Sequence, residues 1–315
     1  MTQTDTLQKI RRSWLLTPAS SPERIGTAHL SGADVVVLDL AELVPEADKP
    51  AARETVEASI QQVKAGGAEV FVQVDPELIY ADLQASVWPG VAGIVIARME
   101  SPQQVEEAHL LLDRLEEERG LLPDSLEIVA ALETAPGNHQ GYQIAAASTR
   151  VWGLTLGRAD LVMDLRPEPS GEIHMMQYLM QRLITLSNAA GAVPLGAWWR
   201  APDRGLLATP ENTYTAGFRG RAIGFKGSMC INEEQVGSLN QAFTPTDFEI
   251  SAAGSLLDVY REGMAQGMAS VKWDERIIDR GSAVQAQALI DLGAACALKN
   301  ESKEAAVEGR PVPAP

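Results

Sequence analysis

The sequence predicts an α/β protein built as a (β/α)₈ TIM barrel with a C-terminal helical extension. Eight short apolar runs, most of them rich in β-branched residues, recur along the chain, and segments with apolar residues at helical spacing separate them. All eight repeats fit within about 240 residues, which is typical of a barrel. An open doubly wound sheet produces a similar alternation of strands and helices, but eight repeats in this length favour the closed barrel.

The predicted strands are short enough to be buried in a parallel sheet, where strands read as near-continuous hydrophobic runs. In chain order they are Trp14–Thr17, Asp34–Leu40, Glu69–Val74, Gly93–Ala97, Glu127–Leu132, Val151–Leu156, Ala192–Gly196 and Gly224–Cys230.

Amphipathic helices are predicted between these strands. The segments Asp48–Lys64, Pro102–Arg119 and Glu172–Ala190 place apolar residues at helical spacing and polar residues elsewhere. Ser101 followed by Pro102 is a typical helix start, with serine as the cap and proline at the first helical position.

The pattern divides the chain into three parts. Residues 11–242 carry the barrel, and residues 243–298 form a C-terminal helical extension that we expect to contribute to oligomer contacts. Residues 299–315 contain several charges and end in PVPAP, so we expect a disordered tail there.

Charge excludes several classes of partner. The chain has 315 residues with 26 Lys and Arg against 42 Asp and Glu, which gives a formal net charge of −16. Nucleic acids and anionic lipid surfaces both require a basic face, so neither is expected as a partner. An anionic substrate therefore requires a local cationic pocket.

Cysteine content and the N-terminal residues predict a cytoplasmic location. Cys230 and Cys296 lie far apart in the chain, which makes a disulfide framework improbable, and both are expected to be buried small hydrophobes. The N-terminal residues carry charges before any apolar run, unlike a signal peptide, and no stretch approaches a membrane span.

Two carboxylates follow neighbouring predicted strands. Glu133 follows an unbroken apolar run, and Asp160 comes about one β/α repeat later. Active sites of barrels lie at the carboxyl ends of the strands, and Mg²⁺ is commonly held by one or two carboxylates. The pair therefore predicts a magnesium site; alternatively, Glu133 pairs with an arginine and Asp160 caps the next helix.

Six ordered motifs extend from about Arg11 to Asp279. They read RRSWLLTPASSPERI, DVVVLDLAELVPEADKPAAR, ALETAPG, LTLGRADLVMDL, GFKGSMCINEEQVGSLNQAFTP and DERIID. Together they resemble the citrate lyase beta subunit-like group of the HpcH/HpaI aldolase superfamily. This group includes malyl-CoA and citramalyl-CoA lyases.

The resemblance implies a barrel, commonly trimeric, that cleaves or forms a carbon–carbon bond next to a thioester or keto acid with Mg²⁺. By position, Glu133 and Asp160 correspond to the metal ligands, with Glu133 also facing the substrate, and Arg12 helps to bind substrate oxygens. The aspartate of the family's MID motif reaches a neighbouring subunit's active site, which makes Asp279 the shared catalytic acid here.

Several departures from the family pattern fall at substrate-binding positions. Gln73 stands where the family has an arginine that grips a keto acid carboxylate, and a neutral amide cannot form that bidentate ion pair. Arg98 replaces a lysine after the fourth strand, and Ala41 replaces an acidic residue of DLED. Asn232 stands in place of a histidine.

Trp198, Trp199 and Arg200 follow the seventh predicted strand, where the family often has an aspartate. These residues predict either a pocket for a flat or apolar group or an anchor at a subunit contact.

Three functions remain open on this evidence. The first is a Mg²⁺-dependent lyase that acts on a small organic acid or an acyl-CoA through a metal-stabilised enolate, with altered specificity. The second uses the same metal site for thioester hydrolysis or condensation. The third is a barrel that has lost catalysis and serves in binding or assembly.

Overall fold

The computed structural model of the protein describes residues 9–157, 164, 172–199 and 208–311. Eight parallel strands form its main sheet, in the order β7-β6-β5-β4-β3-β2-β1-β8. They are β1 (Ser13–Pro18), β2 (Val35–Asp39), β3 (Glu69–Val74), β4 (Val91–Ile96), β5 (Glu127–Ala131), β6 (Val151–Thr155), β7 (Val193–Leu195) and β8 (Ser228–Cys230). Each of the eight predicted strands is therefore confirmed, with ends that differ by a few residues at most.

The sheet curls into a nearly closed barrel. Between β7 and the residues just before β8, the amide of Lys226 donates to the carbonyl of Pro194, and the amide of Gly196 donates to the carbonyl of Gly227. These contacts join the two ends of the strand order, so the predicted (β/α)₈ barrel is confirmed.

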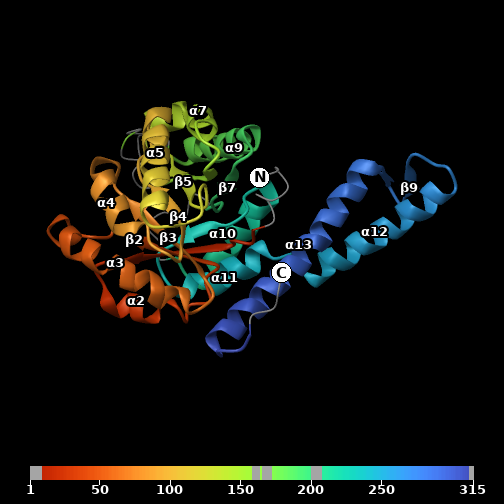
Figure 1. Ribbon diagram of the computed structural model, residues 1–315. Coiled ribbons are helices and arrows are strands. Elements are labelled where there is room, and N and C mark those ends of the chain that lie inside the picture. The colour runs from red at the N-terminus through yellow and green to blue at the C-terminus, as the bar shows by residue number, and fades with distance from the viewer. Residues whose placement is uncertain (1–8, 158–163, 165–171, 200–207, 312–315) are drawn as a thin grey trace.

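Helices surround the barrel and cover its outer face (Figure 1). They are α2 (Pro22–Ala28), α3 (Lys49–Lys64), α4 (Ile79–Ser86), α5 (Pro102–Glu118), α6 (Ala135–His139), α7 (Gly141–Ala146), α9 (Glu172–Ala190), α10 (Pro210–Ile223) and α11 (Glu234–Phe243), with short 3-10 turns at Glu46–Asp48 and Pro76–Leu78. The predicted start of α5 is confirmed, since Ser101 and Gln104 form a reciprocal capping box and Pro102 occupies the first helical position.

Two apolar clusters account for the core. Side chains such as Trp14, Phe71 and Trp152 fill the inside of the barrel, with the rings of Phe71 and Trp152 centred 4.8 and 5.5 Å from that of Trp14. A larger cluster, which includes Leu38 and Ile94, packs between the strands and the surrounding helices. Alternation along each strand therefore sends one set of side chains inward and the other toward the helices.

The C-terminal residues form an arm that projects from the barrel (Figure 1). It consists of α12 (Asp247–Ala265), the hairpin strands β9 (Val271–Trp273) and β10 (Arg276–Ile278), and α13 (Arg280–Val307). The hairpin lies at the outer tip, and the far end of α13 returns past the barrel. The predicted helical extension is thus present.

The tail predicted to be disordered from residue 299 requires a correction. Helix α13 continues to Val307, and within this stretch Lys303 and Ala305 are buried. The ammonium of Lys303 lies 2.6 Å from a carboxylate oxygen of Asp34, and this long-range contact outweighs the polar composition that suggested disorder.

Two further expectations concern cysteines and membranes. Cys230 and Cys296 are both buried and carry free thiols, as predicted, and burial raises the pKa of the Cys230 thiol to about 12. Within the described ranges, no helix combines the length and apolar character needed to cross a bilayer.

Candidate functional site

Glu133 lies just beyond β5, at the carboxyl end of the barrel. The strand itself is entirely buried, and Thr134 begins α6 by accepting a hydrogen bond from the amide of Gly137. This cap fixes the chain directly after Glu133. The glutamate is only 7% exposed, and the backbone amide of Arg98 donates to its Oε2 at 2.8 Å.

Arg98 connects this glutamate to a second carboxylate. Its φ of 46° is unusual for a residue with a side chain, and such backbone conformations cluster at functional sites. While its amide faces Glu133, its guanidinium donates to Asp75 Oδ1 at 2.9 Å. The Arg98 side chain keeps 40% of its surface exposed, so it remains accessible to a ligand at the barrel mouth.

Asp75 is held by several donors. Lys49 Nζ lies 3.0 Å from its Oδ2, and the backbone amide of Glu77 donates to its Oδ1. Burial alone raises the pKa of Asp75, but the Glu77 amide, Lys49 and Arg98 outweigh it and leave that pKa below the usual range. Sequence reasoning gave no role to Lys49; the available signal was its place at the start of a helix, directly after an acidic 3-10 turn.

Asp39 and Gln73 are paired on neighbouring strands at the same end of the barrel. They are register partners in β2 and β3, and both side chains are buried. Burial raises the pKa of Asp39, and hydrogen bonds from the amides of Ala41 and Leu43 offset only part of this rise. Gln73 thus lies toward the carboxyl end of the barrel and brings an amide instead of a charge, while its role in substrate binding stays a prediction.

Asp160 and Arg200 lie outside the described residues. Gly157 and Asp164, the described residues on either side of Asp160 in the chain, both lie close to residues 133–135. A side chain at Gly157 would meet the Glu133 carboxylate at 2.2 Å, and Asp164 accepts a hydrogen bond from the amide of Ala135. A side chain at position 157 would therefore displace the Glu133 carboxylate.

A cavity of about 180 Å³ lies at the carboxyl ends of β6 and β7 and beside β8. Its walls include the apolar side chains of Leu156, Met180 and Trp199, together with the polar Thr155 and Ser228. The two tryptophans predicted to form a pocket or an anchor thus have different environments. Trp199 lines this cavity, whereas Trp198 packs against the main core.

Arg12 is not brought together with these groups. It precedes β1, so it lies at the amino end of the barrel, opposite to Glu133, which follows its strand. Its Nε and Nη2 donate to the carboxylate of Asp34, and further bonds reach Thr244 and Asn300. With a side chain 3% exposed, Arg12 holds the barrel to the arm, and we do not include it in the candidate site.

Asp279 lies on the arm, away from the barrel of its own chain. It caps α13 by accepting hydrogen bonds from the amide and hydroxyl of Ser282, next to the hairpin at the arm tip (Figure 1). These bonds lower the pKa of its exposed carboxyl. Within one chain the arm tip and Glu133 therefore belong to separate regions.

A second group with metal-ligating side chains lies on the surface near α5. His109, Asp113 and Asp124 bring three potential ligand atoms within 4.8 Å of one another. Arg150 ion-pairs with both aspartates, at 2.6 and 3.3 Å, so their charges are already compensated. We interpret this group as an ion-pair cluster that surrounds a buried arginine.

Comparisons with known proteins were made with the whole chain. The profile of the family described as HpcH/HpaI aldolase/citrate lyase matches residues 12–233. The citrate lyase subunit beta of Leuconostoc mesenteroides subsp. cremoris is 25% identical over 288 residues, which cover 90% of this chain and 94% of that protein. The L-malyl-CoA/beta-methylmalyl-CoA lyase of Rhodobacter capsulatus is 24% identical over 313 residues, or 92% of this chain and 96% of that protein.

Among solved structures, the fold is similar to that of protein CitE from Mycobacterium tuberculosis in complex with magnesium, acetoacetate and coenzyme A. The TM-score is 0.71 at 22% identity, with 91% of this chain and 99% of that chain covered. At this identity the likeness shows that the two chains share the barrel fold.

Proposed function

Because the chain belongs to the HpcH/HpaI aldolase/citrate lyase family, a family of carbon–carbon lyases, we propose that it is a Mg²⁺-dependent lyase acting on a 2-oxo or hydroxy acid or its acyl-CoA. The observation that carries this proposal is the position of Glu133. It is a buried carboxylate at the carboxyl end of the barrel, held by the backbone of Arg98. That end is where barrel enzymes build their active sites.

The residues present fit a magnesium ion. Magnesium prefers oxygen ligands from one or two carboxylates and retains several waters. Glu133 supplies such an oxygen, and we assign Asp160 as the second ligand because its flanking neighbours, Gly157 and Asp164, both contact the segment around Glu133. When bound, Mg²⁺ polarises a 2-oxo group and stabilises the negative charge that develops as the carbon–carbon bond breaks.

The other side chains at the barrel mouth bind and orient the substrate. Arg98 carries a partly exposed guanidinium that can pair with a substrate carboxylate while its own backbone keeps Glu133 in place. Gln73 offers a neutral hydrogen-bonding amide two strands away from β5. Lys49 is buried and neutralised by Glu46 and Asp75, so it maintains the site and leaves substrate contact to Arg98.

This composition indicates a changed substrate preference. Without an arginine at position 73, the site has one cation fewer for gripping a keto acid carboxylate. The neighbouring cavity, with Leu156, Met180 and Trp199 in its walls beside the hydroxyls of Thr155 and Ser228, has room for a substrate group of mixed polarity beside the reacting carbons.

We further propose that the complete active site forms between subunits. Asp279 lies on a projecting arm, far from the Glu133 of its own chain, and an arm of this kind can deliver the carboxylate to a neighbouring barrel. A homotrimer is the arrangement that the resemblance to the family implies. Dissociated subunits should then retain Mg²⁺ binding but lose turnover, as sedimentation measured alongside activity can show.

Calorimetric titration with Mg²⁺ tests the metal site. Wild type, Asp160→Asn and Glu133→Gln are compared with and without oxaloacetate, pyruvate and acetyl-CoA, and Glu107→Gln on the exposed face of α5 serves as the control. We expect both site variants to weaken Mg²⁺ binding at least about tenfold, and a 2-oxo acid to tighten binding in wild type only. Absence of Mg²⁺ binding in wild type under all conditions would refute the proposal.

Product analysis then separates the reaction types that share this metal site. Cleavage of a carbon–carbon bond yields two smaller carbon skeletons, whereas thioester hydrolysis releases free coenzyme A and leaves the acyl skeleton intact. Metal binding with neither product, for every acyl-CoA tried, would favour a binding or assembly role.

A further inference from the structure

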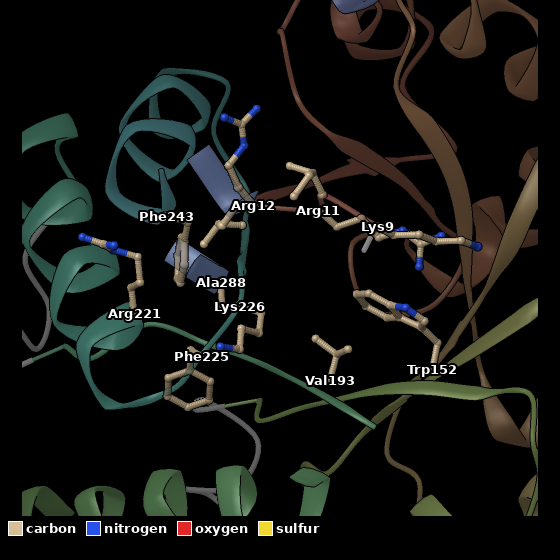
Figure 2. A pocket seen from close by; sticks show the side chains of 12 residues that line it. Lys9, Arg11, Arg12, Trp152, Val193, Arg221, Phe225, Lys226, Phe243 and Ala288 are labelled. Carbon is tan, nitrogen blue, oxygen red and sulfur yellow. The ribbon is translucent and has the colours of Figure 1, made fainter. Parts of the chain in front are cut away.

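A second cavity lies at the opposite, amino end of the barrel. Its volume is about 250 Å³, and both the barrel and the arm contribute to its walls. Val193 and Phe225 come from around β7 and β8, Phe243 ends α11, and Ala288 and Leu292 belong to α13. Figure 2 shows Val193, Phe225, Phe243 and Ala288 around a common space. This space and Glu133 lie at opposite ends of the strands, although Phe225 lines both this cavity and the one beside β6 and β7.

Positive charge is concentrated around this cavity. Lys9, Arg11, Arg12, Arg221 and Lys226 line it, and none of its described lining residues is acidic. The chain as a whole has 42 acidic residues against 26 basic ones. The excess of basic over acidic residues in the lining of this cavity is therefore the reverse of the charge balance of the chain.

Four of the five cations already have carboxylate partners. Arg11 and Lys9 both pair with Glu127, and Arg12 pairs with Asp34. A separate ion pair joins Arg221 to Glu249 at 2.7 Å.

Lys226 is different. Among the described residues, no carboxylate lies within ion-pair distance of its ammonium group, and Figure 2 shows its side chain between Phe225 and Val193. Lys226 is solvent-exposed at the edge of the cavity. Where the protein covers it, desolvation lowers its pKa, and the positive charge of Arg221 lowers that pKa further. A bound anion would relieve both effects, because it supplies the missing opposite charge.

The remaining walls determine what kind of anion fits. They are formed by the apolar side chains of Ile10, Trp152, Val193, Phe225, Phe243 and Leu292, next to the ammonium group of Lys226. One available ammonium suits a monoanion better than a phosphate dianion, which is usually held by several donors. The volume of about 250 Å³ is smaller than the roughly 300–1,000 Å³ of typical ligand pockets, so it suits a small apolar group.

We propose that this cavity binds an amphiphilic monocarboxylate, with its carboxylate on Lys226 and its apolar chain against the walls between barrel and arm. Such a ligand would bridge the two parts of the chain, since α13 contributes Ala288 and Leu292 to the same cavity. The site is independent of the proposed lyase reaction.

Calorimetry with octanoate as the probe tests this proposal. We expect octanoate to bind once per chain, and acetate and 1-octanol to bind at least about tenfold more weakly, because acetate lacks the apolar chain and octanol lacks the charge. Lys226→Met should weaken octanoate binding at least about tenfold, whereas Lys226→Arg should retain it within a few-fold. Lys272→Met, which removes an exposed lysine on the arm hairpin, is the matched control and should bind octanoate as wild type does.

Three outcomes would overturn the proposal. They are the absence of octanoate binding to wild type, equal affinity of octanol and octanoate, and unchanged affinity in Lys226→Met. Competition between octanoate and oxaloacetate would place octanoate at the Glu133 end and would also contradict it. The Mg²⁺ titration is a separate measurement, so failure here leaves the lyase proposal unaffected.

Discussion

The two ends of the barrel use charged residues in opposite ways. At the amino end, Arg11 and Arg12 have side chains no more than 3% exposed; Arg11 pairs with Glu69 and Glu127, and Arg12 pairs with Asp34. At the carboxyl end, Arg98 is 40% exposed, and its contacts with Glu133 and Asp75 leave it open to the barrel mouth. Full enclosure serves stability, whereas partial exposure allows ligand binding.

Arg11 covers the aromatic interior of the barrel at its amino end. Its guanidinium lies 4.3 Å from the ring centre of Trp152 and 4.9 Å from that of Phe71, and it pairs with Glu69 and Glu127 on the outside. The interior of the barrel is therefore capped by a cation stacked on aromatic rings. Among the described residues at the carboxyl end, no guanidinium is stacked on aromatic rings over Glu133 in this way.

The largest effect is expected from Asp34→Ala at the amino end. This carboxylate is fully buried between Arg12 and Lys303, so its removal leaves two buried cations without their partner. We expect the free energy of unfolding to fall by about 3–5 kcal/mol in urea titrations. Asp258→Ala, which breaks an exposed pair with Arg261 on the arm, should change it by less than about 1 kcal/mol.

Mg²⁺ binding by the Asp34→Ala variant tests whether the amino and carboxyl ends of the barrel are independent. If the amino end is purely structural, folded Asp34→Ala protein at low temperature should bind Mg²⁺ as wild type does. Loss of Mg²⁺ binding by the folded variant would show that the comparison is wrong and that the two ends are coupled.

A smaller effect, confined to the carboxyl end, is expected from Gly157→Ala. The added methyl group would overlap the Glu133 carboxylate, so the carboxylate must move. We expect activity and Mg²⁺ affinity to fall about tenfold or more, because a displacement of about 1 Å in a catalytic group has such consequences. Gly237→Ala in α11, where a methyl group meets nothing within 4 Å, should leave both unchanged.

The smallest effect concerns pH. The pKa of Asp75 is lowered in the folded protein, so this carboxylate stabilises the fold above the ordinary aspartate pKa of about 3.9 and loses that contribution as the pH falls through the lowered value. In Asp75→Asn, stability measured by urea unfolding should therefore decline less steeply below about pH 4. An identical acid profile for wild type and variant would contradict the assignment of Asp75 to the network with Lys49 and Arg98.

Much of the fold could be predicted because it depends on local patterns. Short apolar runs such as Val35–Asp39 have few alternatives to a buried strand, and Glu133 directly after such a run must emerge at the carboxyl end. The same logic, applied to Arg12, would have placed it at the amino end, since it precedes its strand. The family resemblance led instead to a substrate-binding role that the structure does not bring together with Glu133.

What the sequence alone determined is the order and polarity of the eight strands, and with it the end of the barrel at which Glu133 and Gln73 lie. Only the tertiary structure decided the long-range partners. The pairing of Lys303 with Asp34 joins residues from opposite ends of the chain, and it turned a segment of polar composition into a docked helix. The apolar pattern of a few consecutive residues is enough to predict a buried strand and its direction in the sheet. A charged side chain such as that of Lys303, in contrast, can be buried only where a carboxylate from a distant part of the chain lies beside it.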